Sequence, residues 1–321
     1  MTIVRFLARR LGATLLLLLV LSFLVFALLA ASPGSPLQTL IGSRPPSPEL
    51  LAAVEAKYHL DQPFLVQYWH WLAGAVHLDL GQSISVQTDL AVLALIGDRA
   101  AISVQLGIYA VVLVLGFGIP LGMAAGIRRG SATDRTVSFL ATFCISAPPF
   151  VLSIALLYVF GVALGWFPVY GVGEGVGERI AHLTMPAAAL AGFLSAVVIR
   201  QTRAATLTVM QQDFITFARI RGLSPARVLI RYALRNSSLP VVTSAGLLLI
   251  ATLSAGLFVE QVFSLPGIGT LLLQAVINKD IPVVQGLAIL MGAVVAVVNL
   301  TVDLLGLALD PRTRTISKAG A

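Results

Sequence analysis

The sequence predicts an all-α protein that crosses a membrane about six times, and two observations support this fold class. Hydrophobic residues make up 58% of the 321 residues and charged residues only 11%, and the mean hydropathy is +0.94. A water-soluble domain needs roughly 25% charged residues to solvate its surface. The apolar residues also gather in runs near the length of about 20 residues that crosses a hydrocarbon core. Backbone groups cannot stay unpaired in lipid, so such runs must be helices.

Six stretches qualify as membrane spans: residues 11–31, 101–127, 137–164, 184–199, 238–259 and 283–309. The first is longer than the apolar core of a cleaved signal peptide, about 7–15 residues, and is therefore interpreted as an uncleaved span. Three glycines in the second span, Gly118, Gly122 and Gly126, permit close helix packing. Pro148 and Pro149 predict a kink in the third span.

Lysine and arginine are distributed unevenly between the two sides of this arrangement. They lie mainly before the first span, in the loops after the second and fourth spans, and after the sixth, where 16 of the 21 basic residues are found. The positive-inside rule places these segments, and both termini, in the cytoplasm. This topology accounts for the net charge of +7, and binding to nucleic acid is not expected, because the basic residues are scattered among apolar runs.

The spans divide the chain into parts with different surroundings. Residues 1–31 form the cytoplasmic N-terminus and first span, 32–100 an external loop domain, and 313–321 a cytoplasmic tail. Residues 101–312 form a five-helix core, which includes a cytoplasmic loop at 201–237.

The external loop domain contains a predicted short helix over residues 48–60 and then an amphipathic stretch rich in aromatic residues, at Phe64, Tyr68, Trp69 and Trp71. Such side chains prefer the headgroup level of a bilayer. A belt that seats the loop on the membrane is therefore favoured over direct contact with a transported solute.

What the sequence lacks excludes several functions. No lysine follows a glycine, so there is no Gly-Lys-Ser/Thr loop to hold ATP. Glu260 lies at the outer end of the fifth span and Asp303 in the inner third of the sixth, so neither forms the midplane site of an ion-coupled carrier. The four histidines are external or interfacial and lack a partner at metal-ligand spacing, and Cys144 is the single cysteine. We expect no enzymatic activity, no metal and no cofactor in this chain.

The cytoplasmic loop at 201–237 predicts two short helices joined by a turn. Asp213 is a suitable N-cap, and helical spacing follows at Phe214, Phe217, Ala218 and Arg221. Gly222 ends this helix, because glycine readily adopts the left-handed conformation at such a position. Ser224-Pro225 begins a second helix. The pair is basic on one side and apolar on the other, which suits equally a helix pair resting on anionic lipid and an element that docks on a partner.

The segment Asp213–Pro240 resembles the EAA loop of binding-protein-dependent ABC importers, and its Ala-Leu-Arg-Asn run is similar to the dipeptide/oligopeptide branch. Motifs along most of the chain also resemble the inner-membrane B-type permease of that family: Leu60-Asp-Gln-Pro63, Gly81-Gln-Ser83, Pro120-Leu-Gly122, Ser146-Ala-Pro-Pro-Phe150, the segment from Glu260 to Gly269, and Asp310-Pro-Arg312. The glutamate and first alanine that name the loop are replaced here by Thr216 and Phe217, and Gly306 stands where a tyrosine is often found. Asp134 and the loop around it look ordinary.

The resemblance implies a type I importer permease in the bacterial inner membrane, forming half of a translocation pore for di- or oligopeptides. It also implies these partners: a second homologous permease, two cytoplasmic ATPase subunits that hold ATP and Mg, an external substrate-binding protein, and membrane lipid. ATP hydrolysis would be coupled to alternating access through the EAA helix, which docks in a cleft of an ATPase. The implied docking residues are Thr216, Phe217, Ala218, Arg219, Arg221, Gly222 and Leu223. Candidates for the pore or gate are Ser146, Pro148, Pro149, Phe150 and Glu260.

Two other classes of protein compete with this interpretation. An ion-coupled secondary transporter is opposed by the absence of midplane charge and of an inverted repeat in hydropathy. A membrane scaffold without a transport role is opposed by the docking loop. The cargo stays open among dipeptides, oligopeptides, haem and nickel, because in this family it depends largely on the binding protein.

Overall fold

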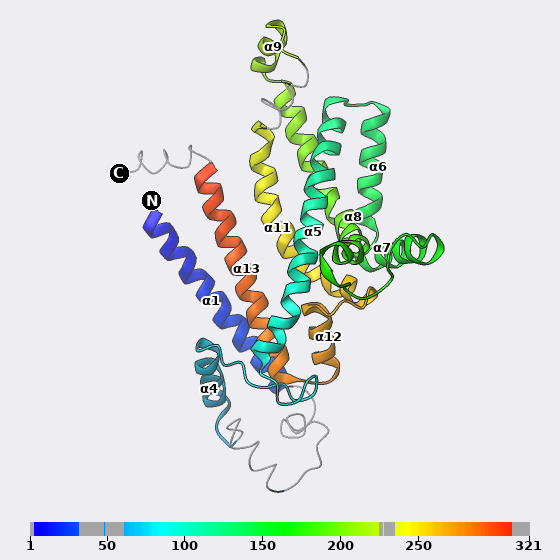
Figure 1. Cartoon of the computed structure of the whole chain (residues 1–321). Coiled ribbons are helices and arrows are strands. Elements are labelled where there is room, and N and C mark those ends of the chain that lie inside the picture. Colours follow the sequence, from blue (N-terminus) through cyan, green and yellow to red (C-terminus); the bar gives the residue numbers. More distant parts are fainter. Residues whose placement is uncertain (1–2, 32–47, 49–60, 225–226, 228–234, 310–321) are drawn as a thin grey trace. The chain divides into compact units, whose positions relative to one another are not determined.

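The structure is a computed structural model of the whole chain, and it describes residues 3–31, 48, 61–224, 227 and 235–309 (Figure 1). Within these ranges the chain is helical, and β pairing is limited to an isolated bridge between Gln82 and Ala91. The predicted all-α class is therefore confirmed. The predicted helix over 48–60 lies almost entirely outside the described residues.

The chain divides into two compact units, which are described separately. The first unit comprises Met1–Ile102 and Pro266–Val297, and the second comprises Ser103–Leu265 and Val298–Ala321. Two long helices, α5 (Val92–Ile127) and α13 (Ile281–Leu309), contribute to both units.

In the first unit, α4 (Phe64–Val76) packs against α1 (Ile3–Ala30) through aromatic side chains. Edge-to-face and tilted ring contacts join Phe23 and Phe26 of α1 to Phe64, Tyr68 and Trp71 of α4. The Tyr68 hydroxyl also shares a hydrogen bond of 2.8 Å with Ser22 Oγ. Aromatic pairs of this geometry are favourable beyond the area that they bury, so they fix α4 on the span.

The opposite face of α4 is also apolar, and it is exposed. Leu65, Trp69 and Val76 lie at helical spacing and are 66%, 67% and 73% exposed. Of the most apolar 18-residue stretch of α1, only 6% is buried. Both helices therefore present apolar surface outward, as expected where lipid takes the place of water.

The segment between α4 and α5 is held against the corner between α12 (Ile268–Ile277) and α13 by one carboxylate. Asp280 is fully buried. Its Oδ2 accepts hydrogen bonds of 2.6–3.0 Å from Ser83 Oγ and from the backbone amides of Ile84, Ser85 and Val86. A carboxylate that receives successive amides in this way orders the turn that supplies them. Neither this arrangement nor α12 was predicted from the sequence.

In the second unit, α8 (Gly175–Met210) packs against α6 (Ala132–Ser146), α7 (Pro149–Leu156) and α11 (Arg235–Val262). A π-helix, η1 (Leu157–Ala163), continues α7, and the short helix α9 (Asp213–Ile220) follows α8. Figure 1 shows α9 and the turn between α5 and α6 at the same end of this unit.

Close contact between α5 and α8 depends on the glycines predicted to permit it. A Cβ atom on Gly122 would lie 2.7 Å from the Ile199 carbonyl oxygen and 2.8 Å from Thr202 Cβ. One on Gly126 would lie 2.9 Å from the carbonyl oxygen of Arg203. Real Cβ atoms do not approach so closely, and tightly packed helices cannot absorb such overlap. The structural interpretation of these glycines is confirmed.

The described residues contain four helices that are long and apolar enough to cross a membrane: Ala8–Ala30 within α1, α5, α8, and Ile281–Leu304 within α13. The third expected span is not continuous, since Ala132–Ser146 and Pro149–Ala163 are bent by 104° and count as a fifth span only if taken together. The remaining expected span, 238–259, falls on α11, whose described apolar part, Gly246–Val262, is shorter than a span.

Two helices also extend beyond the bounds expected from hydropathy. α5 begins at Val92, inside the segment assigned to the external loop domain, because Val92, Leu95 and Ile96 are buried in a cluster with Leu271. α8 continues to Met210, inside the segment assigned to the cytoplasmic loop. Hydropathy marks where a helix is apolar, whereas packing decides where it ends.

Candidate functional site

The short helix α9 is mounted on the last turn of α8. Its Ile215 and Ala218 side chains are buried, and Val209 and Met210 from the end of α8 pack against them together with Leu223. The joint between the two helices is short, and the Gln212 carbonyl accepts a hydrogen bond from the Ile215 amide. The orientation of α9 is therefore set by the inner end of α8.

A glycine turn ends α9 in the predicted conformation. Gly222 has a φ of +76°, and the Leu223 amide donates a hydrogen bond of 3.2 Å to the Ala218 carbonyl. Leu223 also packs against the buried Ala218. These features form a Schellman motif, in which a left-handed residue closes the helix and an apolar contact covers the closure. Asp213, predicted as the N-cap, instead lies in the first turn of the helix.

The outward face of α9 carries apolar side chains with no cover in the described structure. Phe217 is 64% exposed and Ile220 is 76% exposed. Of the other predicted docking residues, those that are also exposed are Thr216, Arg221 and Gly222. Ala218 is buried, so its side chain does not belong to this face. Leu223 is half-buried and packs against Ile215 and Ala218.

Sequence reasoning missed Ile220, although its spacing of three residues from Phe217 could have indicated it. The side chain of Arg219 and most of the predicted second helix after Ser224 lie outside the described residues.

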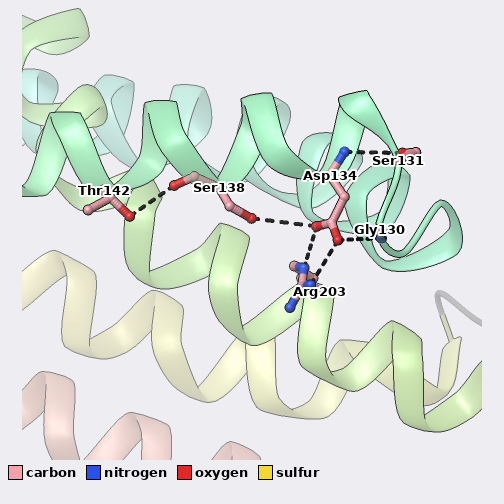
Figure 2. Close-up of polar contacts among 6 residues, drawn as sticks. All are labelled: Gly130, Ser131, Asp134, Ser138, Thr142 and Arg203. Carbon is pink, nitrogen blue, oxygen red and sulfur yellow. Dashed lines mark hydrogen bonds and ion pairs between the residues drawn. The ribbon is translucent and has the colours of Figure 1, made fainter.

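An ion pair joins the inner ends of α6 and α8 (Figure 2). Arg203 Nε donates to Asp134 Oδ1 at 2.6 Å, and Arg203 Nη2 donates to Asp134 Oδ2 at 2.9 Å. The Asp134 side chain is 6% exposed and that of Arg203 is 32% exposed. This pair was not predicted from the sequence, and its two-point geometry needs both side chains to be held in place.

The candidate pore residues surround the break between α6 and α7. Ala147 and Pro148 have extended backbone, with ψ values of 125° and 147°, because a residue before proline is pushed out of the helical region. Pro149 then begins α7 at its first turn. Pro148 and Phe150 are exposed, and the exposed Ser146 donates its hydroxyl to the Thr142 carbonyl at 2.7 Å. The predicted kink is confirmed and is a sharp bend.

Glu260, on α11, is buried. It is 3% exposed, and its Oε1 accepts a hydrogen bond of 2.5 Å from Ser103 Oγ on α5. Phe258, on the same helix α11, lies against Phe150 with ring centroids 6.4 Å apart. The structure thus brings the Phe150 side chain to α11, but it does not bring the pore candidates to α9.

In the described ranges, no group of three or more His, Cys, Asp or Glu side chains is placed so that it could hold a metal ion. The site offers an apolar, exposed helix face packed on the end of α8, which is long and apolar enough to cross a membrane. An exposed apolar face of this kind is suited to docking on another protein.

Several membrane-spanning helices, one of which carries a short exposed helix beyond its end, define a multi-pass membrane protein. Residues 118–315 match the family described as "Binding-protein-dependent transport system inner membrane component", and residues 3–106 match the N-terminal part described for such components. The chain belongs to this family, and it is a multi-pass protein of the bacterial inner membrane.

Individual relatives and solved structures agree with this assignment. The chain is 35% identical over 336 residues to the dipeptide transport system permease protein DppB of Escherichia coli (strain K12), covering 97% of this chain and 98% of DppB. It is 34% identical over 309 residues to a protein of Brucella abortus (strain 2308) named as a peptide transport system permease, covering 95% of this chain and 98% of that protein. A crystal structure titled as an inward-facing conformation of the MetNI methionine ABC transporter is similar in fold, with a TM-score of 0.58, 17% identity, and coverage of 68% of this chain and 97% of that chain.

Proposed function

We propose that this chain forms half of the pore of an ATP-driven importer for di- or oligopeptides and that α9 docks on a cytoplasmic ATPase subunit. The observation that carries the proposal is the exposed apolar face of α9, mounted on α8 through the buried Ile215 and Ala218. Burying an exposed phenylalanine or isoleucine side chain contributes about 1.5–3 kcal/mol. The Phe217 and Ile220 side chains therefore offer a compact, favourable contact for a cleft.

The mount explains how such a contact transmits motion. Because α9 is packed on the end of α8, a displacement of α9 moves α8 with it, and α8 packs against α6, α7 and α11. Closure of two ATPase subunits around ATP would move α9 in each of two permeases and switch the pore between inward-open and outward-open states. The bend at Ala147–Pro148 gives that pore a break in regular helix, where substrate can approach the backbone.

Peptides are proposed as the cargo because the similar proteins of Escherichia coli and Brucella are named as dipeptide or peptide permeases. The partners then comprise a second permease, two ATPases that bind ATP and Mg, and an external binding protein. This chain supplies no catalytic group, in agreement with the absence of a Gly-Lys-Ser/Thr motif.

Site-directed crosslinking in the assembled importer tests the docking surface. Cys144 is the one cysteine, so Cys144→Ala gives a background into which Phe217→Cys or Ile220→Cys is introduced. Each should crosslink to the ATPase through a short bifunctional thiol–amine reagent. Arg129→Cys is the matched control, because Arg129 is exposed at the same end of the second unit but lies in the α5–α6 turn.

The crosslinked complex should also lose peptide transport into proteoliposomes, because the docked helix can no longer move freely. Crosslinking of Arg129→Cys alone, with no product from either α9 position, would show that the ATPase binds elsewhere. Equal transport by this permease without any ATPase would instead favour an ion-coupled carrier.

A further inference from the structure

One carboxylate organises the inner ends of three helices in the second unit. Asp134 Oδ2 accepts a hydrogen bond of 2.9 Å from the Gly130 amide, in the turn that leads from α5 into α6. The Asp134 amide in turn donates to the Ser131 hydroxyl, which caps α6. Gly130 has a φ of +80°, so the turn uses a conformation that glycine adopts without strain. The Asp134 carboxylate thus holds the α5–α6 turn, which lies next to it in the chain.

The same carboxylate then holds α8. Figure 2 shows the Arg203 guanidinium facing both oxygens of Asp134, in the two-point arrangement that gives arginine–carboxylate pairs their directional strength. Next to this pair, Gly126 of α5 lies against the Arg203 carbonyl and Thr206 of α8. The inner end of α8 is therefore held by close packing from α5 and by a charged pair from α6.

The position of this pair along α8 means that a small change at the pair would displace α9. Arg203 precedes Met210, the last residue of α8, by two helical turns, or about 10 Å at 1.5 Å per residue. Those two turns carry Val209 and Met210, on which α9 is seated. Any change in the direction of α8 at Arg203 would be enlarged at α9.

We infer that the Asp134–Arg203 pair is a positioning device that sets the angle of the docking helix α9 by fixing the inner end of α8 to the α5–α6 turn. The inference deepens the proposed function and rests on it. Neither side chain contacts the ATPase or the cargo in this scheme, so both act through α8. Without the pair, α9 keeps its exposed face but points in a range of directions. A movement of the ATPase then reorients α9 instead of moving α8.

The experiment uses the complete importer reconstituted in proteoliposomes with its binding protein and a peptide. Two mild substitutions loosen the pair: Asp134→Asn keeps the size of the side chain, and Arg203→Lys keeps the positive charge but cannot bind both oxygens in a fork. We expect the ATPases to co-purify with both variants, because the exposed face of α9 is unchanged. Binding-protein-stimulated ATP hydrolysis and transport should fall about tenfold, the order expected for one lost charge-assisted hydrogen bond.

A distance measurement gives the readout that a general loss of stability would not produce. Spin labels at Phe139 on α6 and Asp213 on α9, both exposed, report the position of α9 in the Cys144→Ala background. The distribution should be narrow in the parent protein and broad in Asp134→Asn and Arg203→Lys. Arg200→Lys is the matched control, because Arg200 is exposed on the same helix and donates to the Ala196 carbonyl of that helix. It should behave as the parent in every measurement.

The outcomes separate the two proposals. A narrow distance distribution with normal stimulation in Arg203→Lys would overturn the inference, and so would a broad distribution with normal stimulation. If Gly222→Val, which distorts α9 directly, transports normally as well, the docking role of α9 fails and the inference fails with it. If Gly222→Val is impaired while Asp134→Asn and Arg203→Lys are normal, the docking role stands and the inference alone is wrong.

Discussion

The amide of Leu223 reaches back across Gly222 to donate a 3.2 Å hydrogen bond to the carbonyl of Ala218, and the two side chains pack together. This closure holds α9 against the end of α8. It depends on the positive φ of Gly222, since a residue restricted to negative φ would direct Leu223 away from Ala218.

Gly222→Val should reduce transport and binding-protein-stimulated ATP hydrolysis severely at normal membrane abundance. A Cβ at Gly222 meets no atom within 4 Å, so the cost is conformational rather than steric. Strain of this kind is about 1–3 kcal/mol for a residue that must adopt positive φ. Gly222→Ala should be milder, and Gly177→Val should be near normal, because Gly177 is helical and has open space at its Cβ position. Normal stimulation in Gly222→Val would show that the Schellman turn does not set the docking helix.

Gly122→Ala should destabilise the second unit by about 1–3 kcal/mol, the usual cost of forcing extra volume into a packed interface. The added methyl would lie 2.7 Å from the Ile199 carbonyl oxygen. Gly116→Ala, on the same helix with nothing within 4 Å, should be neutral or slightly stabilising. Thermal unfolding of the purified variants in detergent compares the two, and equal midpoints would contradict the close α5–α8 contact.

Asp280→Ala should release the turn at residues 83–87 from the α12–α13 corner. The change leaves three amides and the Ser83 hydroxyl without their shared acceptor. Hydrogen bonds to a charged group contribute about 1.5–3 kcal/mol each in favourable cases, so hydrogen exchange of Ile84, Ser85 and Val86 should accelerate by at least about tenfold. Asp79→Ala is the control, since exposed Asp79 receives the Gly81 amide. Unchanged protection in Asp280→Ala would show that the turn is held by other contacts.

Trp69 should be quenched by brominated lipids. The α4 face that carries Leu65, Trp69 and Val76 is exposed, while the aromatic face opposite is occupied by α1. The three tryptophans are Trp69, Trp71 and Trp166, so Trp71→Phe with Trp166→Phe leaves Trp69 as the reporter. Strong quenching supports the predicted headgroup-level belt. No lipid quenching, together with a fluorescence change on adding peptide-loaded binding protein, would favour contact with the delivered solute.

Membrane orientation is tested by thiol labelling of intact cells in the Cys144→Ala background. Cysteines at Thr88 and Val176 should react with an impermeant reagent outside, and one at Ser224 should react only after the membrane is opened. All three positions are exposed, whereas Ser83 is buried against Asp280 and would label poorly from either side. External labelling of Ser224→Cys would reverse the topology inferred from the basic residues.

The sequence alone determined the properties that depend on composition and on local backbone preference. Apolar length indicated that segments 11–31, 101–127, 184–199 and 283–309 fall in long apolar helices, since unpaired backbone is unfavourable in lipid whatever the neighbouring helices are. The turn at Gly222 and the break before Pro149 were also predictable from local backbone preference. Glycine adopts positive φ without strain, and proline keeps the residue before it out of the helical conformation. The family resemblance rested on motifs of this local kind.

Only the tertiary structure decided which polar residues matter. Asp134 and Arg203 are 69 positions apart in the chain and Ser83 and Asp280 are 197 apart, and no local pattern marks either pair. Each pair forms because packed helices or turns bring the two segments within hydrogen-bond distance, where a buried carboxylate requires partners. The same reason explains why Ala218 is buried while Ile220, two residues later, is exposed. The side of a short helix that faces inward is chosen by the element on which it is seated, in this case the end of α8.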